Sequence, residues 1–208
     1  PLTGISSYAQ MLIDETPDDD PRRRMLEKVE RQTFRASQIV NNLLDFARHR
    51  HDGMARVDLR QVVTDALSLL DERARRSGAV LDWRLSDEKY PVLGLEGELQ
   101  QVVTNLVVNA LDAMIDQQAE RRVRVTVEQA GGRVLCAVSD SGPGIPNERL
   151  DTIFKPFFSS KIGRGGTGLG LAISHNIVRR HGGEIAVRNH EDARGCTFTV
   201  DLPAADAV

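Results

Sequence analysis

The sequence lacks the features that mark membrane-spanning, nucleic-acid-binding and disulfide-rich proteins. No apolar run approaches the roughly 18 residues that a membrane-spanning helix needs. The formal net charge is -3 and aromatic residues make up only 4% of the 208 residues, so there is neither a basic excess nor a supply of rings for stacking on bases. The only cysteines, Cys136 and Cys196, lie in strand-like runs, where we expect buried thiols and no disulfide. We expect a cytoplasmic chain without a nucleic-acid partner, joined to a membrane only through segments upstream of this sequence.

What remains is the composition of an ordinary globular protein. Apolar residues make up 40% of the chain and charged residues 27%, which is enough to bury a sizeable core. The length suits one large domain or one domain with a helical extension.

The first 50 residues predict a helical hairpin. Apolar residues recur at helical spacing before the segment TPDDDP at Thr16–Pro21, whose prolines end the helix, and a heptad pattern runs from Met25 to Arg50. The apolar stripe of the second helix is wider than a two-stranded seam requires, so we expect two copies to form a dimeric four-helix bundle. A monomeric hairpin that packs on the following domain is the alternative.

After a polar linker at residues 51–56, helices and strands alternate over residues 57–208. The patterns predict helices at Leu59–Arg76, Glu98–Gln118 and Leu169–Arg180. They predict strands at Val80–Leu85, Val92–Leu95, Val123–Gln129, Val134–Asp140, Glu184–Arg188 and Thr197–Leu202. The order indicates an α/β sandwich with antiparallel strand pairs.

Two amides interrupt the apolar face of the second of these helices. Asn105 and Asn109 lie four residues apart and therefore on one side of the helix. Buried amides are costly unless they are hydrogen-bonded, so both must face a ligand or bridge the helix to neighbouring elements.

A carboxylate and two glycines follow the strand at Val134–Asp140. In DSGPGIP, Asp140 ends the strand, and Gly142 and Gly144 remove side chains from the path beside it. A carboxylate in this setting can accept a hydrogen bond from the amino group of a flat ligand, while the bare backbone allows close approach.

The third feature is the glycine-rich stretch KIGRGGTGLGLAIS, which leads into a helix. Free N–H groups at a helix start favour phosphate oxygens, and Lys161 and Arg164 add positive charge nearby. Its glycines also match the dinucleotide pattern G-x-G-x-x-G, but no buried strand precedes them and too few residues follow for a dinucleotide fold. A flexible loop is the remaining alternative.

Taken in order, N-x-x-x-N-A, D-x-G-x-G-I, F-x-P-F-F and G-T-G-L-G-L-A-I resemble the N, G1, F and G2 boxes of sensor histidine kinases. The closing GCTFTVDLP and the opening PLTGISSYAQML resemble further segments of that family, and FFSSK is typical of its nitrogen-regulation-like members. The likeness covers almost the whole chain.

The resemblance implies an α+β protein, with a dimerisation and phosphotransfer hairpin at residues 1–50 and an ATP-binding domain of the Bergerat (GHKL) type at residues 57–208. Asp140 would hold the adenine amino group with support from Thr197. Asn109 would bind Mg²⁺, with Asn105 beside it. The remaining residues expected at the nucleotide are glycines of the two loops and one lysine: Gly142, Gly144, Gly166, Gly168, Gly170 and Lys161. Three phenylalanines, Phe154, Phe157 and Phe158, would dock on the hairpin.

The implied reaction is ATP-dependent phosphorylation of a histidine, followed by transfer to an aspartate of a response regulator receiver domain. The family pattern places the acceptor histidine five residues before Pro1, and none of the five histidines present matches its motif. Gyrase-type and chaperone-type ATPases carry a Glu where Asn105 stands, and Asn is not a base, so we expect little ATP hydrolysis. Asp112 stands where many members carry a basic residue and would repel phosphate.

Two rival functions remain open from the residues alone. One is a pseudokinase or scaffold whose ATP site serves assembly only. The other is an anti-sigma-type serine kinase, which shares the ATP domain but lacks the long hairpin.

Overall fold

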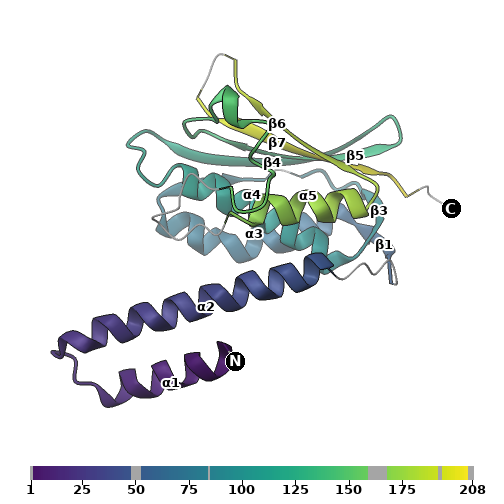
Figure 1. Cartoon of the computed structure of the whole chain (residues 1–208). Helices are drawn as coiled ribbons and strands as arrows, with labels where there is room; N and C mark the ends of the chain where they lie inside the picture. The colour runs from purple at the N-terminus through teal and green to yellow at the C-terminus, as the bar shows by residue number, and fades with distance from the viewer. Residues whose placement is uncertain (1, 48–52, 84, 159–167, 192–193, 206–208) are drawn as a thin grey trace.

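The computed structural model describes residues 2–47, 53–83, 85–158, 168–191 and 194–205. They form a helical hairpin and an α/β domain, and helix α2 of the hairpin contacts helix α5 of that domain (Figure 1). None of the described helices combines the length and hydropathy that crossing a membrane requires.

The predicted hairpin is confirmed as α1, Leu2–Glu15, and α2, Pro21–Ala47. Asp20 accepts a hydrogen bond from the backbone N–H of Arg22 at 2.8 Å, so a carboxylate caps α2 directly before Pro21. The guanidinium of Arg23 donates to the carbonyl oxygens of Ile13 and Thr16 at 2.8 and 2.6 Å, which satisfies acceptors at the end of α1. The turn is thus fixed from both helices.

The α/β domain is built on a five-stranded sheet with the order β2, β4, β5, β7, β6. The strands are β2 (Ala79–Asp82), β4 (Arg121–Ala130), β5 (Arg133–Asp140), β6 (Glu184–Asn189) and β7 (Cys196–Pro203). Only β2 and β4 run parallel, and the other neighbours are antiparallel. The antiparallel pairing expected from the sequence is therefore confirmed for most of the sheet.

Three helices lie on one face of this sheet (Figure 1). They are α3 (Leu59–Arg76), α4 (Glu96–Ala113) and α5 (Gly170–Arg180). Their buried faces meet the alternate buried positions of β4, β5 and β7 in one apolar core. Alternation along the strands therefore decides which side chains face the helices.

Several details differ from the sequence-based expectation, and β2 ends at Asp82 and not at Leu85. β3 (Pro91–Gly94) pairs with β1 (Ala55–Asp58), a strand that the sequence analysis missed, in a separate two-stranded sheet. Helix α4 ends at Ala113 and not at Gln118. The backbone leaves the helical conformation at Met114, and the side chain of Met114 is fully buried. A short 3-10 helix, η1, occupies Asn147–Arg149.

A neutral histidine joins the start of α4 to the end of α5. The N–H of Leu95 donates to Nε2 of His181 at 3.0 Å, so the ring proton lies on Nδ1, which donates to the carbonyl oxygen of Ile177 at 2.8 Å. The side chain is buried, and a Cβ on Gly94 would lie 2.6 Å from its ring. His181 is thus a structural residue.

Candidate functional site

The two amides of α4 lie on one side of the helix, as their spacing predicts, but they have different surroundings. Nδ2 of Asn105 donates to the carbonyl oxygen of Gly170 and to Oγ of Ser174, both at 3.3 Å. Asn109 is half-buried and makes no hydrogen bond to the part of the chain that the structure describes. Asn105 therefore joins two helices, whereas the amide of Asn109 is available to a ligand.

Asp140 ends β5 with its side chain buried on the helix-facing side of the sheet. Its Oδ1 accepts a hydrogen bond from the N–H of Gly142 at 2.8 Å. A Cβ on Gly142 would lie 2.7 Å from the same oxygen, so a side chain there would displace the carboxylate from this position. The backbone at Gly142 therefore lies directly beside the carboxylate.

The second donor to Asp140 is a cysteine that the sequence analysis did not assign to the site. Sγ of Cys196 donates to Oδ2 of Asp140 at 3.2 Å. Burial and the neighbouring carboxylate raise the pKa of the Cys196 thiol above its usual value, so the thiol keeps its proton and remains a donor at neutral pH. Two donors therefore fix the carboxylate, one on each oxygen.

Thr197 does not fit the role that the sequence analysis gave it. It pairs with Ser139 across β5 and β7, and along both strands the side chains at these positions point away from the helices. Its Oγ1 lies 2.9 Å from Nε2 of His190, and Cys196 occupies the helix-facing position instead. The sequence-based role was wrong by one residue, because the face of a strand residue depends on the pairing.

Gly144 lies in the loop that follows Asp140. Its φ of +76° is in the left-handed region that favours glycine. A Cβ there would lie 3.0 Å from Oδ1 of Asn189 and 3.4 Å from the carbonyl oxygen of Gly195. The loop is therefore in direct contact with the turn that joins β6 to β7.

At the base of the glycine-rich stretch, Gly168 packs backbone against backbone on Phe157. Gly168 has a φ of +69°, and a Cβ there would lie 2.6 Å from the carbonyl carbon of Phe157, whose own φ is +65°. Helix α5 then begins at Gly170, and its N-cap residue Leu169 makes no side-chain capping bond to the first turn. Lys161, Arg164 and Gly166, three residues predicted to face phosphate, lie outside the described residues.

The phenylalanines divide into two groups, which corrects the expectation that all three dock on the hairpin. Phe154 packs within its own domain, with ring centroids 5.5 Å from His175 and 6.4 Å from Phe198. Phe158 is also packed against the core, whereas Phe157 is 58% exposed. Phe157 is therefore the most exposed of the three, and Phe154 and Phe158 are partly buried.

Asp112, expected to repel phosphate, has a cationic partner. Its Oδ1 lies 3.1 Å from Nη2 of Arg73 on α3. The ion pair places a guanidinium beside the acidic side chain and reduces the local negative charge.

Comparisons with known proteins agree with this arrangement. Residues 94–206 match the family described as "Histidine kinase-, DNA gyrase B-, and HSP90-like ATPase", and residues 1–52 match the "His Kinase A (phospho-acceptor) domain". Sensor histidine kinase ZraS of Escherichia coli is 34% identical over 98% of this chain, which spans 42% of that relative. The C4-dicarboxylate transport sensor protein DctB of Pseudomonas aeruginosa is 34% identical over 100% of this chain, which spans 34% of it.

Solved structures show the same fold. Full-length ShkA in complex with AMPPNP superimposes with a TM-score of 0.81 at 28% identity, over 100% of this chain and 44% of that one. Histidine kinase ThkA in complex with the response regulator protein TrrA gives a TM-score of 0.74 at 25% identity, over 99% of this chain and 58% of that one. The chain therefore belongs to the histidine kinase-, DNA gyrase B- and HSP90-like ATPase family and, with its His kinase A domain, is the catalytic core of a two-component sensor histidine kinase.

Proposed function

We propose that this core binds Mg-ATP between α4, the loop after Asp140 and the start of α5. In the full-length protein it would transfer the γ-phosphoryl to a histidine that precedes Pro1, and from there to an aspartate of a response regulator. The single observation that carries the proposal is the buried carboxylate of Asp140, held by Gly142 and Cys196. The AMPPNP complex of the similar ShkA supports the nucleotide, and the ThkA–TrrA complex supports the partner.

Adenine recognition is assigned to Asp140. A carboxylate accepts more hydrogen bonds than the two it has here, so it can also accept one from the exocyclic amino group of adenine. Gly142 and Gly144 leave the adjoining backbone bare and allow a flat base to approach. Cys196 takes over the supporting role first given to Thr197.

The phosphates and the metal are assigned to the space between α4 and α5. The amide of Asn109 supplies the kind of oxygen that Mg²⁺ prefers, and no group of three or more His, Cys, Asp or Glu among the described residues could hold a metal alone. This donor set fits an ion held mainly by phosphate oxygens. Bound Mg²⁺ would neutralise phosphate charge. Gly168 and Gly170 position the start of α5 near these groups, and we propose that Lys161 and Gly166 contribute as well.

Asn105 supports phosphotransfer over hydrolysis. Its Nδ2 is engaged by Gly170 and Ser174, and an amide does not take a proton from water. We therefore assign Asn105 a positioning role. We expect slow hydrolysis of bound ATP and transfer of the γ-phosphoryl to the imidazole of a histidine on the hairpin.

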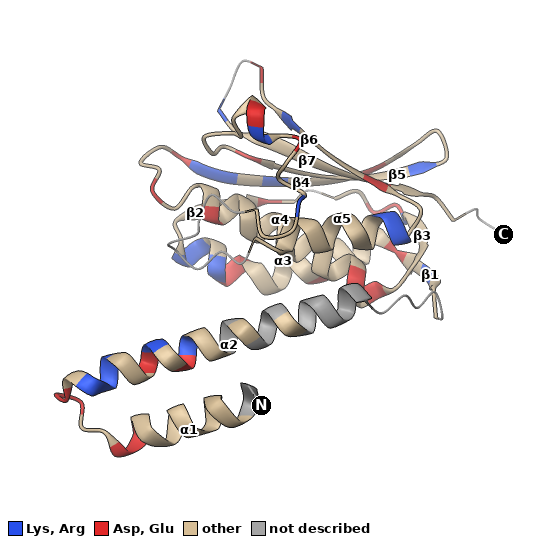
Figure 2. Cartoon of the chain, viewed as in Figure 1, with Lys and Arg blue, Asp and Glu red and all other residues tan. Residues whose placement is uncertain are grey.

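The hairpin is proposed to dimerise. Its packing buries Ala9, Ile13 and Thr33, yet other apolar residues of both helices remain exposed. The exposed set comprises Ile5, Tyr8, Met11, Leu12, Met25, Val29 and Val40. Helix α1 carries no charge before Asp14, whereas α2 is charged along its first half (Figure 2). A second copy would cover this surface in a four-helix bundle.

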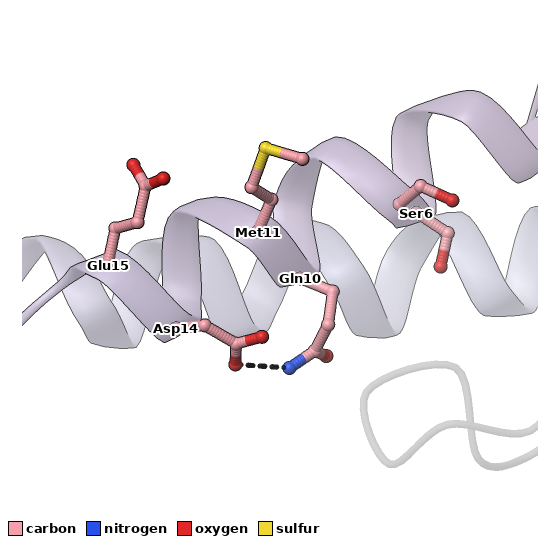
Figure 3. Close-up of a pocket in the computed structure, with 6 residues that line it drawn as sticks. Ser6, Gln10, Met11, Asp14 and Glu15 are labelled. Carbon is pink, nitrogen blue, oxygen red and sulfur yellow. Dashed lines mark hydrogen bonds between the residues drawn. The ribbon is translucent and has the colours of Figure 1, made fainter.

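A shallow hollow on α1 lies at the same surface. Figure 3 shows it lined by side chains of one helix, among them Ser6, Gln10, Met11 and Asp14, with Gln10 donating to Asp14 at 2.9 Å. A site formed by one helix has no opposing wall, so we assign the hollow to the helix interface and not to the nucleotide.

The proposed boundaries are 1–50 for the hairpin, 51–56 for the linker and 57–208 for the ATP-binding domain.

Two measurements test the proposal. Calorimetric titration should show Mg-ATP binding to this chain, and Asp140→Asn should weaken it strongly because the adenine acceptor is weakened. In the full-length protein, γ-labelled ATP should give an acid-labile, base-stable phosphoprotein that transfers its label to a receiver domain. Binding without any labelling would indicate a scaffold, and absence of binding would refute the nucleotide site.

A further inference from the structure

The turn between β6 and β7 lies directly against the loop at residues 140–145. A Cβ on Gly195 would collide with the carbonyl oxygen of Asp140, and one on Gly144 would lie 3.0 Å from Oδ1 of Asn189. Contacts this close leave no space between the two segments. The position of the loop is therefore set by the β6–β7 turn.

Asn189 connects the two segments through a pair of hydrogen bonds. Its Oδ1 accepts from the N–H of Ile145 at 2.9 Å, and its Nδ2 donates to the carbonyl oxygen of Ile145 at 2.6 Å. One planar amide thus satisfies both backbone groups of Ile145, as a neighbouring strand would. Two bonds from one side chain fix the orientation of the Ile145 backbone as well as its position.

The same two strands hold both ends of the loop. Asn189 pairs with Cys196 across β6 and β7, and the thiol of Cys196 reaches Asp140. Cys196 therefore holds the loop where it begins and Asn189 holds it where it ends. Gly144, between them, has no side chain of its own to make a contact.

We propose that Asn189 is a positioning residue of the nucleotide site, which holds Ile145 so that the loop keeps Asp140 aligned with the amino group of adenine. This inference rests on the proposed function of Asp140. Asn189 itself does not touch the nucleotide. Its effect should therefore appear as selectivity for adenine, and a purely structural role would instead weaken all purine nucleotides alike.

The experiment compares the Kd of Mg-ATP with that of purine ribonucleoside triphosphate, which lacks the 6-amino group. The ratio of the two Kd values reports the bond to Asp140 and does not depend on the folded fraction of a variant. We expect Asn189→Ala to lower the preference for ATP about tenfold, the factor that corresponds to about 1.4 kcal/mol. Asn189→Asp keeps the acceptor for the N–H of Ile145 but replaces the donor to the carbonyl oxygen of Ile145 with a second oxygen, which cannot donate. It should therefore lower the ratio as well.

The matched control is Glu148→Ala, which removes an exposed polar side chain from the same stretch of chain without touching Asn189 and should leave the ratio unchanged. If Asn189→Ala does not fold, Asn189→Asp decides. One outcome would refute the inference and leave the proposed function standing. In that outcome the wild-type chain prefers ATP, Asp140→Asn removes the preference, and the Asn189 variants keep it. A wild-type chain without any preference for ATP would refute the role of Asp140, and the inference with it.

Discussion

Sγ of Cys196 donates a hydrogen bond to Oδ2 of Asp140 at 3.2 Å, from the β7 position that directly faces Asn189 on β6. The N–H of Gly142 binds the other carboxylate oxygen at 2.8 Å. A side chain held on both oxygens has little freedom to rotate. The carboxylate proposed to accept from adenine is therefore oriented before any ligand arrives, which lowers the entropic cost of binding.

Replacing Cys196 tests this orientation. Cys196→Ala removes the donor and should raise the Kd of Mg-ATP about fivefold, since a lost hydrogen bond corresponds to about 1 kcal/mol. Cys196→Ser keeps a donor and should stay within about twofold of the wild type. Titration calorimetry measures both, with Cys136→Ala as the control for loss of a buried thiol on β5. Equal affinities of the Ala and Ser variants would show that the bond has no role.

Cys136 should make the free energy of unfolding fall at alkaline pH. Burial raises the pKa of its thiol from 9.0 to about 12, so the folded state keeps a proton that the unfolded state releases above pH 9. The contribution is complete below pH 9 and is lost as the pH rises toward 12. Between pH 8 and 10.5 the wild type should lose about 1–2 kcal/mol more than Cys136→Ala.

Urea unfolding at the two pH values measures this difference, because titrations of Tyr and Lys are common to both proteins and cancel. Parallel stability curves for the two proteins would contradict the prediction.

Gly168 should tolerate no side chain. Alanine there would adopt an unfavourable positive φ and place its Cβ 2.6 Å from the carbonyl carbon of Phe157, so Gly168→Ala should destabilise the fold by about 2 kcal/mol. Gly97→Ala is the matched control, because Gly97 lies in α4 with open space at the Cβ position. It should stabilise by about 0.5–1 kcal/mol through helix propensity. Chemical denaturation measures both changes, and similar effects would exclude a special role for the contact with Phe157.

The two types of phenylalanine should separate in stability measurements. Phe154→Ala removes ring contacts with His175 and Phe198 and should lower the free energy of unfolding by about 2 kcal/mol. Phe157 is 58% exposed, so Phe157→Ala should change it by less than about 0.5 kcal/mol. Thermal unfolding in parallel checks this, and a larger loss for Phe157 would mean that its ring packs within the domain.

Periodicity predicted most of the architecture, because helices and buried strands leave strong patterns. The hairpin turn was predictable from its two prolines, and Asp140 from a carboxylate that ends an apolar run beside glycines. By contrast, β1 has four residues and two exposed positions, and it depends on pairing with β3, which lies far along the chain. Such a strand has no local signature.

Site residues were predictable where they lie on one helix. They were not predictable where the pairing of strands decides which residues meet. Asn105 and Asn109 share a helix, so their common face followed from spacing alone. Cys196 was missed in favour of Thr197 because the pairing of β7 with β5 decides which residue faces the helices. Asn189 was missed because an asparagine near the end of a strand is also typical of a turn.

The row formed by Asp140, Cys196 and Asn189 crosses three strands, and this makes ligand binding sensitive to how the sheet has assembled. A chain that paired β7 one residue out of place would bring Thr197 inward and Cys196 outward, and its carboxylate would lose the thiol donor. A nucleotide bound at Asp140 stabilises only the chains that have paired correctly, by RT ln(1 + [L]/Kd). On the proposed function, Mg-ATP added during refolding should then raise the yield of native protein, because it binds only chains whose strands have paired correctly.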